Sequence, residues 1–437
     1  MKIKFETIIQ LFFISAVLSV SVSYSKLYLF HILLVILVLS FIHFRINNFE
    51  LKMNKLPTKL HYIFYFMLFW YSLSLYWSIN LSYSMVYLFY ILCGLVIVTT
   101  LVYYLKDIGT QEKLLNILAV VFIVEIALSL LEAFTSFRLP VSPFSSYASY
   151  FGRSMKIGEG LDDGIVAIIM QSPTGFQWNP NNLAVTMLII SPFFLLHTNN
   201  KIKYLGIISI LAIIVTSGSR AVFISFVFML FLYIVFLNKK RFIVFLSVLP
   251  FIIILLLSST ESLKTSENAK VREIASSFDV LMLYLDESTD SADSIGVRQQ
   301  LIINGLVALK SSNYLGVGGG GSMAVQEAYG DIQGYNLTSM HNFWIEMLVE
   351  GGVFFTFIFF LWYLYIVTKL YLIGISTEHI KLKYYSQALF LSMVAFLPGA
   401  VSASSVIYVF PMWIMFGFAI ATINNYKRYK YETTTSI

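Results

Sequence analysis

Apolar stretches of about 20 residues recur along most of this chain, and they constrain its fold more than any other feature. A stretch of that length crosses the hydrocarbon core of a membrane, which is about 30 Å thick. In lipid such a run must be a helix, because a helix satisfies its own backbone hydrogen bonds. Charged residues make up only 12% of the sequence and hydrophobic residues 58%, against about 25% charged residues in soluble domains. We therefore predict an all-α, polytopic membrane protein.

The pattern predicts about twelve transmembrane helices within one integral membrane domain, residues 1–437. The first apolar stretch lacks a small-residue cleavage site, so we interpret it as a helix rather than as a secretory signal. One large polar loop, residues 259–342, separates the ninth span from the tenth. The predicted spans are residues 6–24, 27–44, 60–78, 82–105, 114–134, 180–198, 203–218, 221–237, 242–258, 343–368, 384–400 and 404–424.

Basic residues indicate the orientation, because lysine and arginine gather in alternate loops. Examples are Lys239, Lys240 and Arg241, whereas the short loops of the other set carry almost none. The positive-inside rule then places both termini in the cytoplasm and the loops 135–179 and 259–342 outside. This asymmetry accounts for the net charge of +6, and no nucleic-acid partner is expected.

Metal and cofactor motifs are not evident in the sequence. Cys93 is the sole cysteine and stands inside the fourth span, and the six histidines do not cluster. The acidic stretch 286–293 lacks the spacing of a calcium loop, and there is no Walker-type phosphate-binding motif. We expect no metal and no cofactor.

A polar break, Thr216-Ser217-Gly218-Ser219-Arg220, interrupts the apolar pattern. Only thirteen residues, from Tyr204 to Thr216, precede it, and they give about 20 Å of helix. The break is therefore expected below the outer surface, with Arg220 opening the returning helix from a recess. An arginine inside a membrane is a functional hypothesis by default. The alternative is an arginine that extends to lipid phosphates.

A second polar break leads into the span at 180–198. Pro180 restricts Asn179 to extended conformations, and Asn181 and its neighbour can cap the following helix. Outer loops at such turns also line substrate clefts, so both interpretations remain open.

The large loop contains a helical pattern and a glycine run. Apolar residues within 297–309 recur at helical spacing, and we expect this helix to lie on the membrane surface or to cap the bundle. Arg298 falls in its first turn, where a positive charge opposes the helix dipole. The run Gly316–Gly321 allows either close approach of a ligand or a flexible turn.

His341 stands at the start of the tenth span, where a histidine of near-neutral pKa can accept a proton from an attacking hydroxyl. Capping of the helix is the alternative role. Asn342, Glu346 and Glu350 share one face of that helix. Glu346 and Glu350 are expected to orient His341, to pair with an arginine or to bond a neighbouring helix, and Glu346 is the stronger candidate of the two.

Taken in order and spacing, these motifs resemble the O-antigen ligase and O-antigen polymerase superfamily, with its teichuronic-acid and capsule relatives. The resemblance covers about Pro173 to Val367. It implies a GT-C-like glycosyltransferase of the bacterial inner membrane that works without a metal, on the extracytoplasmic face. The motifs that carry it are residues 173–184, 216–221, 297–298, 316–321 and 341–352.

The resemblance also implies roles for individual residues. The essential arginines and histidine of the family correspond to Arg220, Arg298 and His341. The expected partners are a glycan donor linked to undecaprenyl pyrophosphate, a glycan or lipid acceptor, membrane lipids and, in polymerases, a chain-length regulator. Candidate substrate-binding residues are Ser219, Asn179, Asn181, Asn342, Glu346 and Arg153.

Polymerase and ligase share this scaffold and differ in the acceptor, which is a second lipid-linked repeat unit or a lipid A core. Arg153 precedes Gly164 at a spacing that resembles a polymerase motif, so we predict a polymerase, with a ligase as the alternative. A lipid-linked oligosaccharide flippase is the competing class. That class would show charged or broken helices near the membrane midplane.

Overall fold

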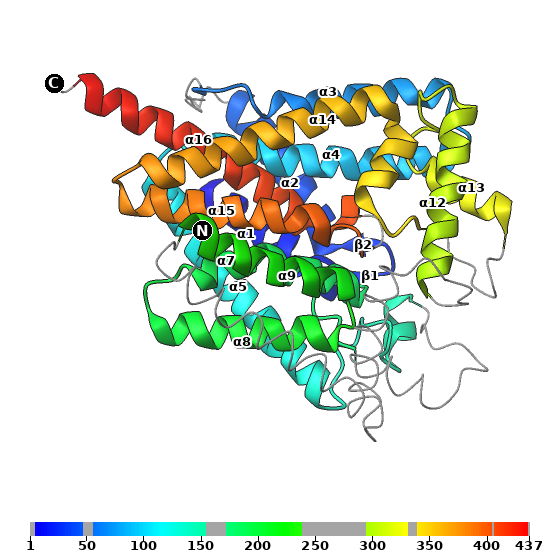
Figure 1. The fold of residues 1–437 in the computed structure, drawn as a ribbon, viewed down its shortest axis with the longest axis horizontal. Helices are drawn as coiled ribbons and strands as arrows, with labels where there is room; N and C mark the ends of the chain where they lie inside the picture. Colours follow the sequence, from blue (N-terminus) through cyan, green and yellow to red (C-terminus); the bar gives the residue numbers. More distant parts are fainter. Residues whose placement is uncertain are drawn as a thin grey trace.

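Helices dominate the computed structural model, which describes residues 5–46, 56–153, 172–237, 294–330, 339–403 and 406–435 (Figure 1). The helices are α1 (Phe5–Leu18), α2 (Leu29–Ile46), α3 (Tyr62–Leu73), α4 (Leu81–Tyr104), α5 (Ile108–Phe134), α7 (Pro180–Leu195), α8 (Asn200–Thr216), α9 (Arg220–Leu232), α12 (Ser294–Ser311), α13 (Gly321–Tyr329), α14 (Phe343–Ser376), α15 (Ile380–Gly399) and α16 (Phe410–Thr435). The shorter elements are an antiparallel strand pair, β1 (Ser23–Tyr24) and β2 (Leu27–Tyr28), 3-10 turns at Ser19–Ser21, Ser74–Tyr76, Ala148–Phe151 and Val406–Tyr408, and a π-helical turn at Tyr233–Leu237.

Each predicted span other than 242–258 overlaps a helix, with ends that differ by several residues in places, and 242–258 lies outside the described residues. Four helical segments of the described chain are long and apolar enough to cross a membrane by length and composition alone. They are Leu81–Tyr104, Ile108–Phe134, Arg220–Leu237 and Phe343–Ser376. The structure is therefore that of an all-α protein with membrane-spanning helices.

The helix before the first polar break is longer than the sequence predicted. The side chain of Asn199 accepts a hydrogen bond from Lys201 N, so α8 begins at Asn200 rather than at Tyr204. Its 17 residues give about 25 Å of helix. That length is still shorter than a hydrocarbon core of about 30 Å.

Most of the helices run side by side, and α12 and α13 lie across one end of the bundle (Figure 1). α15 is central, because it packs against α14, α7, α9 and α16. α12 and α13 occupy the end at the right of Figure 1, together with β1 and β2. The predicted helix within the large loop is thus confirmed as α12, and it caps this end of the bundle.

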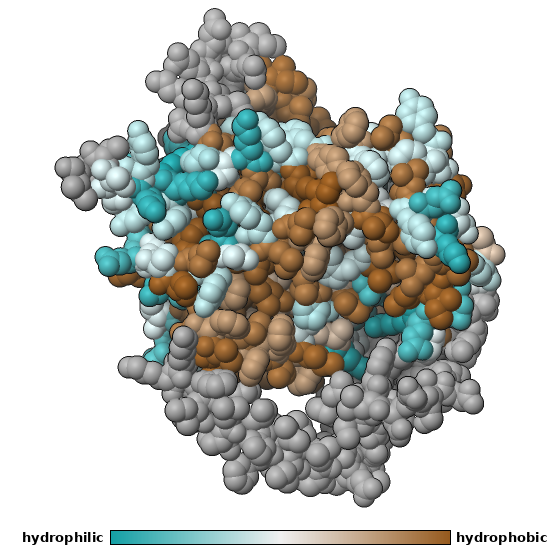
Figure 2. Space-filling model, turned by 45° about the horizontal axis from the view of Figure 1, so that its top comes forward, coloured by the Kyte–Doolittle hydropathy of each residue, from teal (hydrophilic) through white to brown (hydrophobic). Residues whose placement is uncertain are grey.

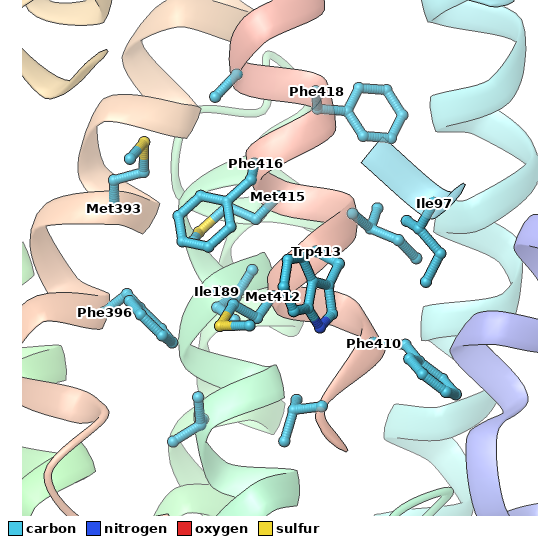
Figure 3. Packing of buried hydrophobic residues seen from close by; sticks show 14 of the residues in the cluster. Ile97, Ile189, Met393, Phe396, Phe410, Met412, Trp413, Met415, Phe416 and Phe418 are labelled. Carbon is cyan, nitrogen blue, oxygen red and sulfur yellow. The ribbon is translucent and has the colours of Figure 1, made fainter. Parts of the chain in front are cut away.

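Bulky side chains packed against small residues hold the centre of the bundle together. Trp413 of α16 lies beside Phe416 and near Phe396 of α15 and Ile97 of α4 (Figure 3). A Cβ on Gly94 of α4 would come within 2.2 Å of the Trp413 ring. Close approach at small residues is the main source of helix association in lipid, where burial itself contributes little.

The outer surface of the bundle is apolar. Figure 2 shows a broad hydrophobic band across one face, with hydrophilic residues gathered toward its two ends. Large apolar side chains are exposed on several helices, for example Val120 at 62% and Ile208 at 65%. Soluble proteins rarely expose apolar patches of this extent. The band has the composition of a surface in contact with lipid chains.

α14 is broken near its start, at Gly352, where φ is 77° and ψ is 172°. The backbone groups released by the break bind to the segment between α12 and α13. Val317 N donates to Val349 O at 2.9 Å, and Val353 N donates to Tyr314 O at 3.1 Å. The indole of Trp70 donates to Gly351 O at 2.7 Å. No water is available in lipid for such groups, so these protein partners make the break possible.

The predicted glycine run lies against this break. A Cβ on Gly316 would come within 2.4 Å of Glu350 O. The φ of Gly318 is 89°, and a Cβ there would meet Ser78 at 2.9 Å. In this structure the glycines provide close approach of one backbone to another, and the run is an ordered part of the fold.

We predict that Gly352→Ala destabilises the protein much more than Gly330→Ala does. Both glycines have positive φ, 77° and 75°, but a Cβ on Gly352 would lie 2.3 Å from Leu315 O, whereas nothing lies within 4 Å of one on Gly330. The conformational cost alone is about 1–3 kcal/mol, and Gly352→Ala adds a steric clash. Thermal unfolding in detergent should show a lower melting temperature for Gly352→Ala than for the control. Equal melting temperatures would contradict this account of the break.

Candidate functional site

Segments that bear the predicted catalytic residues meet at the end of the bundle capped by α12. Phe343 N, at the start of α14, donates to Ala400 O at the end of α15, with a length of 3.1 Å. Two residues further on, Ser402 Oγ lies 2.6 Å from Ser219 Oγ, just before α9. The segments of His341 and Arg220, far apart in the sequence, are therefore joined through the end of α15.

Arg220 is the first residue of α9 and is half-buried. One of its terminal nitrogens, Nη1, is buried and has no hydrogen-bond acceptor among the described residues. A guanidinium can donate five hydrogen bonds, and a buried donor without a partner is costly. Ser219 is almost fully buried, and its hydroxyl is engaged with Ser402 rather than with the first turn of α9. Arg220 therefore has unused donor capacity that suits an anion.

His341 is held in an unusual backbone conformation directly before α14. Its φ is 46°, in the left-handed region that residues other than glycine rarely adopt. The side chain of Asn342 caps the helix, accepting from Trp344 N at 3.2 Å and from Ile345 N at 3.3 Å. Asn342 is therefore the residue that caps α14. Helix capping does not explain why a histidine stands at position 341. Strained residues of this kind gather at functional sites.

Arg298 lies in the first part of α12 and is half-buried. α12 packs against α13 and α14. Gln326 of α13 donates to Leu301 O at 2.8 Å and to Met340 Sδ at 3.1 Å. The end of α12 that carries Arg298 thus lies next to the segment that ends in His341.

Two buried carboxylates occupy the short first part of α14. Tyr87 of α4 donates to Glu346 Oε1 at 3.4 Å, and Ser322 of α13 donates to Glu350 Oε1 at 2.6 Å. Both glutamates are 1% exposed. Of the roles predicted for Glu346, the bond to a neighbouring helix is the one these contacts show. Glu350 ties α14 to the start of α13.

The second polar break forms the loop before α7. Asn179 caps α7, since its side chain accepts from Asn181 N at 2.8 Å. Arg153 lies with its guanidinium 4.5 Å from the centre of the Trp178 ring and donates to Ser23 Oγ at 3.0 Å. The structure therefore places Arg153 against the motif at 173–184, whereas Gly164 falls in the part of the chain that is not described.

Glu132 of α5, which the sequence analysis missed, holds this loop in place. Its buried carboxylate accepts from Thr174 N at 2.7 Å and from Gly175 N at 2.8 Å. Two helical turns earlier in α5, Glu125 accepts a hydrogen bond from the side-chain amide of Gln177 at 3.5 Å. The sequence did contain a signal for this role. Glu125 and Glu132 are seven residues apart and share one face of an apolar span, where carboxylates are rare and have a specific partner.

Arg138 follows α5 and fixes the other side of the same corner. Its guanidinium donates to the carbonyl oxygens of Glu132 and Phe137. Burial lowers the pKa of Arg138 from its usual value, and the nearby Glu132 charge acts in the opposite direction. The loop before α7 is thus supported from α5 and from the residues that follow it.

An apolar groove runs beside the start of α14. It is a cavity of about 430 Å³ between the two parts of α14 and the end of α15. Its walls include Trp344 and Ile345, directly after the cap Asn342, and Pro398 on α15. The polar site at the mouth of the bundle therefore borders a surface suited to a hydrocarbon chain.

No cluster suited to a metal ion is present among the residues that the structure describes, where groups of three or more His, Cys, Asp or Glu side chains were sought. The candidate site instead contains two arginines and a histidine. Arginine binds phosphate oxygens through paired N–H donors.

These features define a polytopic α-helical membrane protein with a polar, arginine- and histidine-bearing site at one end of an apolar bundle. Residues 205–360 match the protein family described as O-Antigen ligase. The chain is also 24% identical over 383 residues to the teichuronic acid biosynthesis protein TuaE of Bacillus subtilis strain 168, an alignment that covers 84% of this chain and 72% of that protein. Both matches support the resemblance of this chain to the O-antigen ligase and polymerase superfamily.

We predict that Glu132→Ala destabilises the loop before α7, because two backbone N–H groups lose a charged acceptor. Such a loss costs about 1–3 kcal/mol. Glu112→Ala is the matched control in the same helix, since the exposed pair of Glu112 with Lys381 is worth only about 0–1 kcal/mol. Thermal unfolding should show a clear drop for Glu132→Ala alone, with faster proteolysis near Thr174. A Glu132→Ala protein that melts like wild type would refute the assignment.

Proposed function

We propose that this protein is a polysaccharide polymerase of the extracytoplasmic face of the bacterial inner membrane. It transfers glycan from undecaprenyl pyrophosphate to a hydroxyl of another lipid-linked repeat unit. The observation that supports this most is the junction of the Arg220 and His341 segments through the end of α15. Similarity to the O-Antigen ligase family and to a teichuronic acid biosynthesis protein supports a reaction of polysaccharide biosynthesis.

In the proposed reaction, the acceptor hydroxyl oxygen attacks the anomeric carbon of the donor glycan. The new carbon–oxygen bond forms as the bond to the pyrophosphate oxygen breaks, and the lipid pyrophosphate leaves with the electron pair. His341 takes the proton of the hydroxyl. Arg220 and Arg298 bind the phosphate oxygens, where negative charge grows in the transition state.

The proposed binding mode divides the substrate between the groove and the polar site. The prenyl chain of the donor lies in the apolar groove beside Trp344 and Pro398, and its pyrophosphate reaches Arg220. The glycans approach from the end of the bundle. We assign substrate contacts to Ser219, Asn179, Asn181, Asn342, Glu346 and Arg153, with the caps and bonds described above fixing several of them in position. The reaction proceeds without a metal, since the arginines supply the positive charge.

A ligase is the second candidate, because the matching family is described as O-Antigen ligase. Arg153 favours the polymerase, since its spacing from Gly164 resembles a polymerase motif and its guanidinium lies against Trp178 in the loop before α7. A flippase is a weaker candidate. The helix breaks at Ser217–Ser219 and Gly352 lie at the capped end of the bundle rather than at the midplane expected of transporters.

The polysaccharide of a deletion strain distinguishes these functions. A polymerase defect leaves single repeat units on the final acceptor. A ligase defect leaves long chains on the undecaprenyl carrier. Loss of a flippase leaves single repeat units on the carrier and facing the cytoplasm. We expect the first result, and either of the others would replace the proposal.

We predict that Arg220→Lys reduces polymer output by about 100-fold or more, the loss typical of removing a transition-state donor. Lysine keeps the charge but cannot make the paired hydrogen bonds of a guanidinium. Arg428→Lys, at the far end of α16, is the matched control and should leave output unchanged. Output is measured by electrophoresis of the polysaccharide, with membrane levels checked by immunoblot. Full output from Arg220→Lys at normal levels would show that Arg220 is only an interfacial anchor.

A further inference from the structure

A second apolar cavity lies between α5, α7, α15 and α16, away from the candidate site. Its volume is about 270 Å³. α5 contributes Leu115, Ala119 and Ile123, and α7 contributes Ile189 and Phe193, with His197 just beyond the end of α7. In both helices these residues stand four apart, so each helix presents one continuous stripe to the cavity. The cavity is therefore a trough that runs parallel to the helices.

The dimensions of the trough suit one hydrocarbon chain. Eight residues separate Leu115 from Ile123, which corresponds to about 12 Å along the helix. Ala119 is exposed, and Ile123 is 50% exposed. The trough is thus open on the side where the apolar surface of the bundle faces lipid, and a chain can enter it laterally.

One end of the trough is polar and basic. His197 Nδ1 accepts from Asn199 N at 3.0 Å, so the neutral ring carries its proton on Nε2. Ile202 of α8 lines this end and stands between Lys201 and Lys203. The trough therefore opens beside three side chains that can donate hydrogen bonds to an anion, those of His197, Lys201 and Lys203.

The two lysines of α8 form no ion pair within the part of the chain that the structure describes. Neither has a carboxylate partner among the described residues, whereas Lys113 and Lys381 at other sites pair with Glu6 and Glu112. Lys201 and Lys203 also occupy the first turn of α8, where positive charge opposes the helix dipole. Their charge serves something other than the stability of α8.

The basic end of the trough is opposite to the candidate site. His197 follows the carboxyl end of α7, whose amino end carries Asn179. Tyr384, which also lines the trough, lies in the first turns of α15, whose other end contacts Phe343. A lipid whose pyrophosphate binds Arg220 would therefore have its headgroup at the end of the bundle opposite to His197, Lys201 and Lys203. Anionic phospholipids of the cytoplasmic leaflet have their headgroups at the same end as these basic residues.

We propose that this trough is a binding site for an anionic phospholipid, with one acyl chain between α5 and α7 and the phosphate at His197, Lys201 and Lys203. The site is separate from the chemistry proposed above and does not depend on it. The bound lipid joins α7 and α8 to α5 at the end of the bundle remote from the candidate site.

Native mass spectrometry of the purified full-length protein tests this site. After delipidation, the protein is titrated with dioleoylphosphatidylglycerol and dioleoylphosphatidylcholine in equal amounts. We expect one tightly held phosphatidylglycerol, retained at least about five-fold over phosphatidylcholine, a ratio that corresponds to about 1 kcal/mol. The double variant Lys201→Gln/Lys203→Gln should lose this preference. The matched control Lys427→Gln/Lys430→Gln, on exposed lysines of α16, should keep it.

A second variant tests the chain-binding part of the site. Ala119→Phe fills the trough from its exposed side and leaves the lysines intact, so binding of phosphatidylglycerol should fall although the charge is unchanged. The proposal is overturned if the lysine variant keeps the preference for phosphatidylglycerol. It is also overturned if wild type holds both lipids equally, or if Ala119→Phe holds phosphatidylglycerol as tightly as wild type does.

Discussion

Backbone groups that have no water to bind are the constraint on which this structure depends. Inside lipid each helix must satisfy its own N–H and C=O groups or obtain a partner from the protein. α14 breaks at Gly352, and the segment between α12 and α13 supplies those partners through Tyr314 and Val317. The end of α15 does the same for the start of α14, where Ala400 O accepts from Phe343 N. Irregular backbone is concentrated where other segments of the chain cover it.

This constraint also explains why the candidate site lies at one end of the bundle. The segments that cover the breaks carry polar residues, and these become close neighbours as the breaks are satisfied. Ser219 and Ser402 bring the start of α9 to the end of α15, and His341 precedes the helix bonded to that same end. The carboxylate of Glu132 fixes the loop before α7 in the same way, through two backbone N–H groups. Packing and polar chemistry therefore depend on the same contacts.

Local sequence was sufficient for the helices and for much of the polar pattern. Apolar length predicted the helices of the bundle, and helical spacing predicted α12 around Arg298, because both signals repeat over many residues. The contacts that assemble the site could not be predicted in this way. The pairs Ser219–Ser402 and Glu132–Thr174 join residues far apart in the chain, and nothing local to either partner identifies the other. The Gly351-Gly352 pair inside an apolar run was a local signal for the break in α14. No local signal indicated that the segment between α12 and α13 would bind the backbone groups at this break. The start of α8 was misplaced because the cap Asn199 was overlooked beside the lysines.

The central claim is that His341 acts as the base of a metal-independent glycan transfer. The most direct measurement is chain extension by purified protein supplied with undecaprenyl-pyrophosphate-linked glycan, with and without EDTA. His379→Ala, at the amino end of α15, is the matched control for His341→Ala. The account predicts that His341→Ala slows extension by about 10²–10⁴-fold, that His379→Ala does not, and that EDTA has no effect on wild type. Extension by His341→Ala at the wild-type rate, or loss of wild-type extension in EDTA, would contradict it.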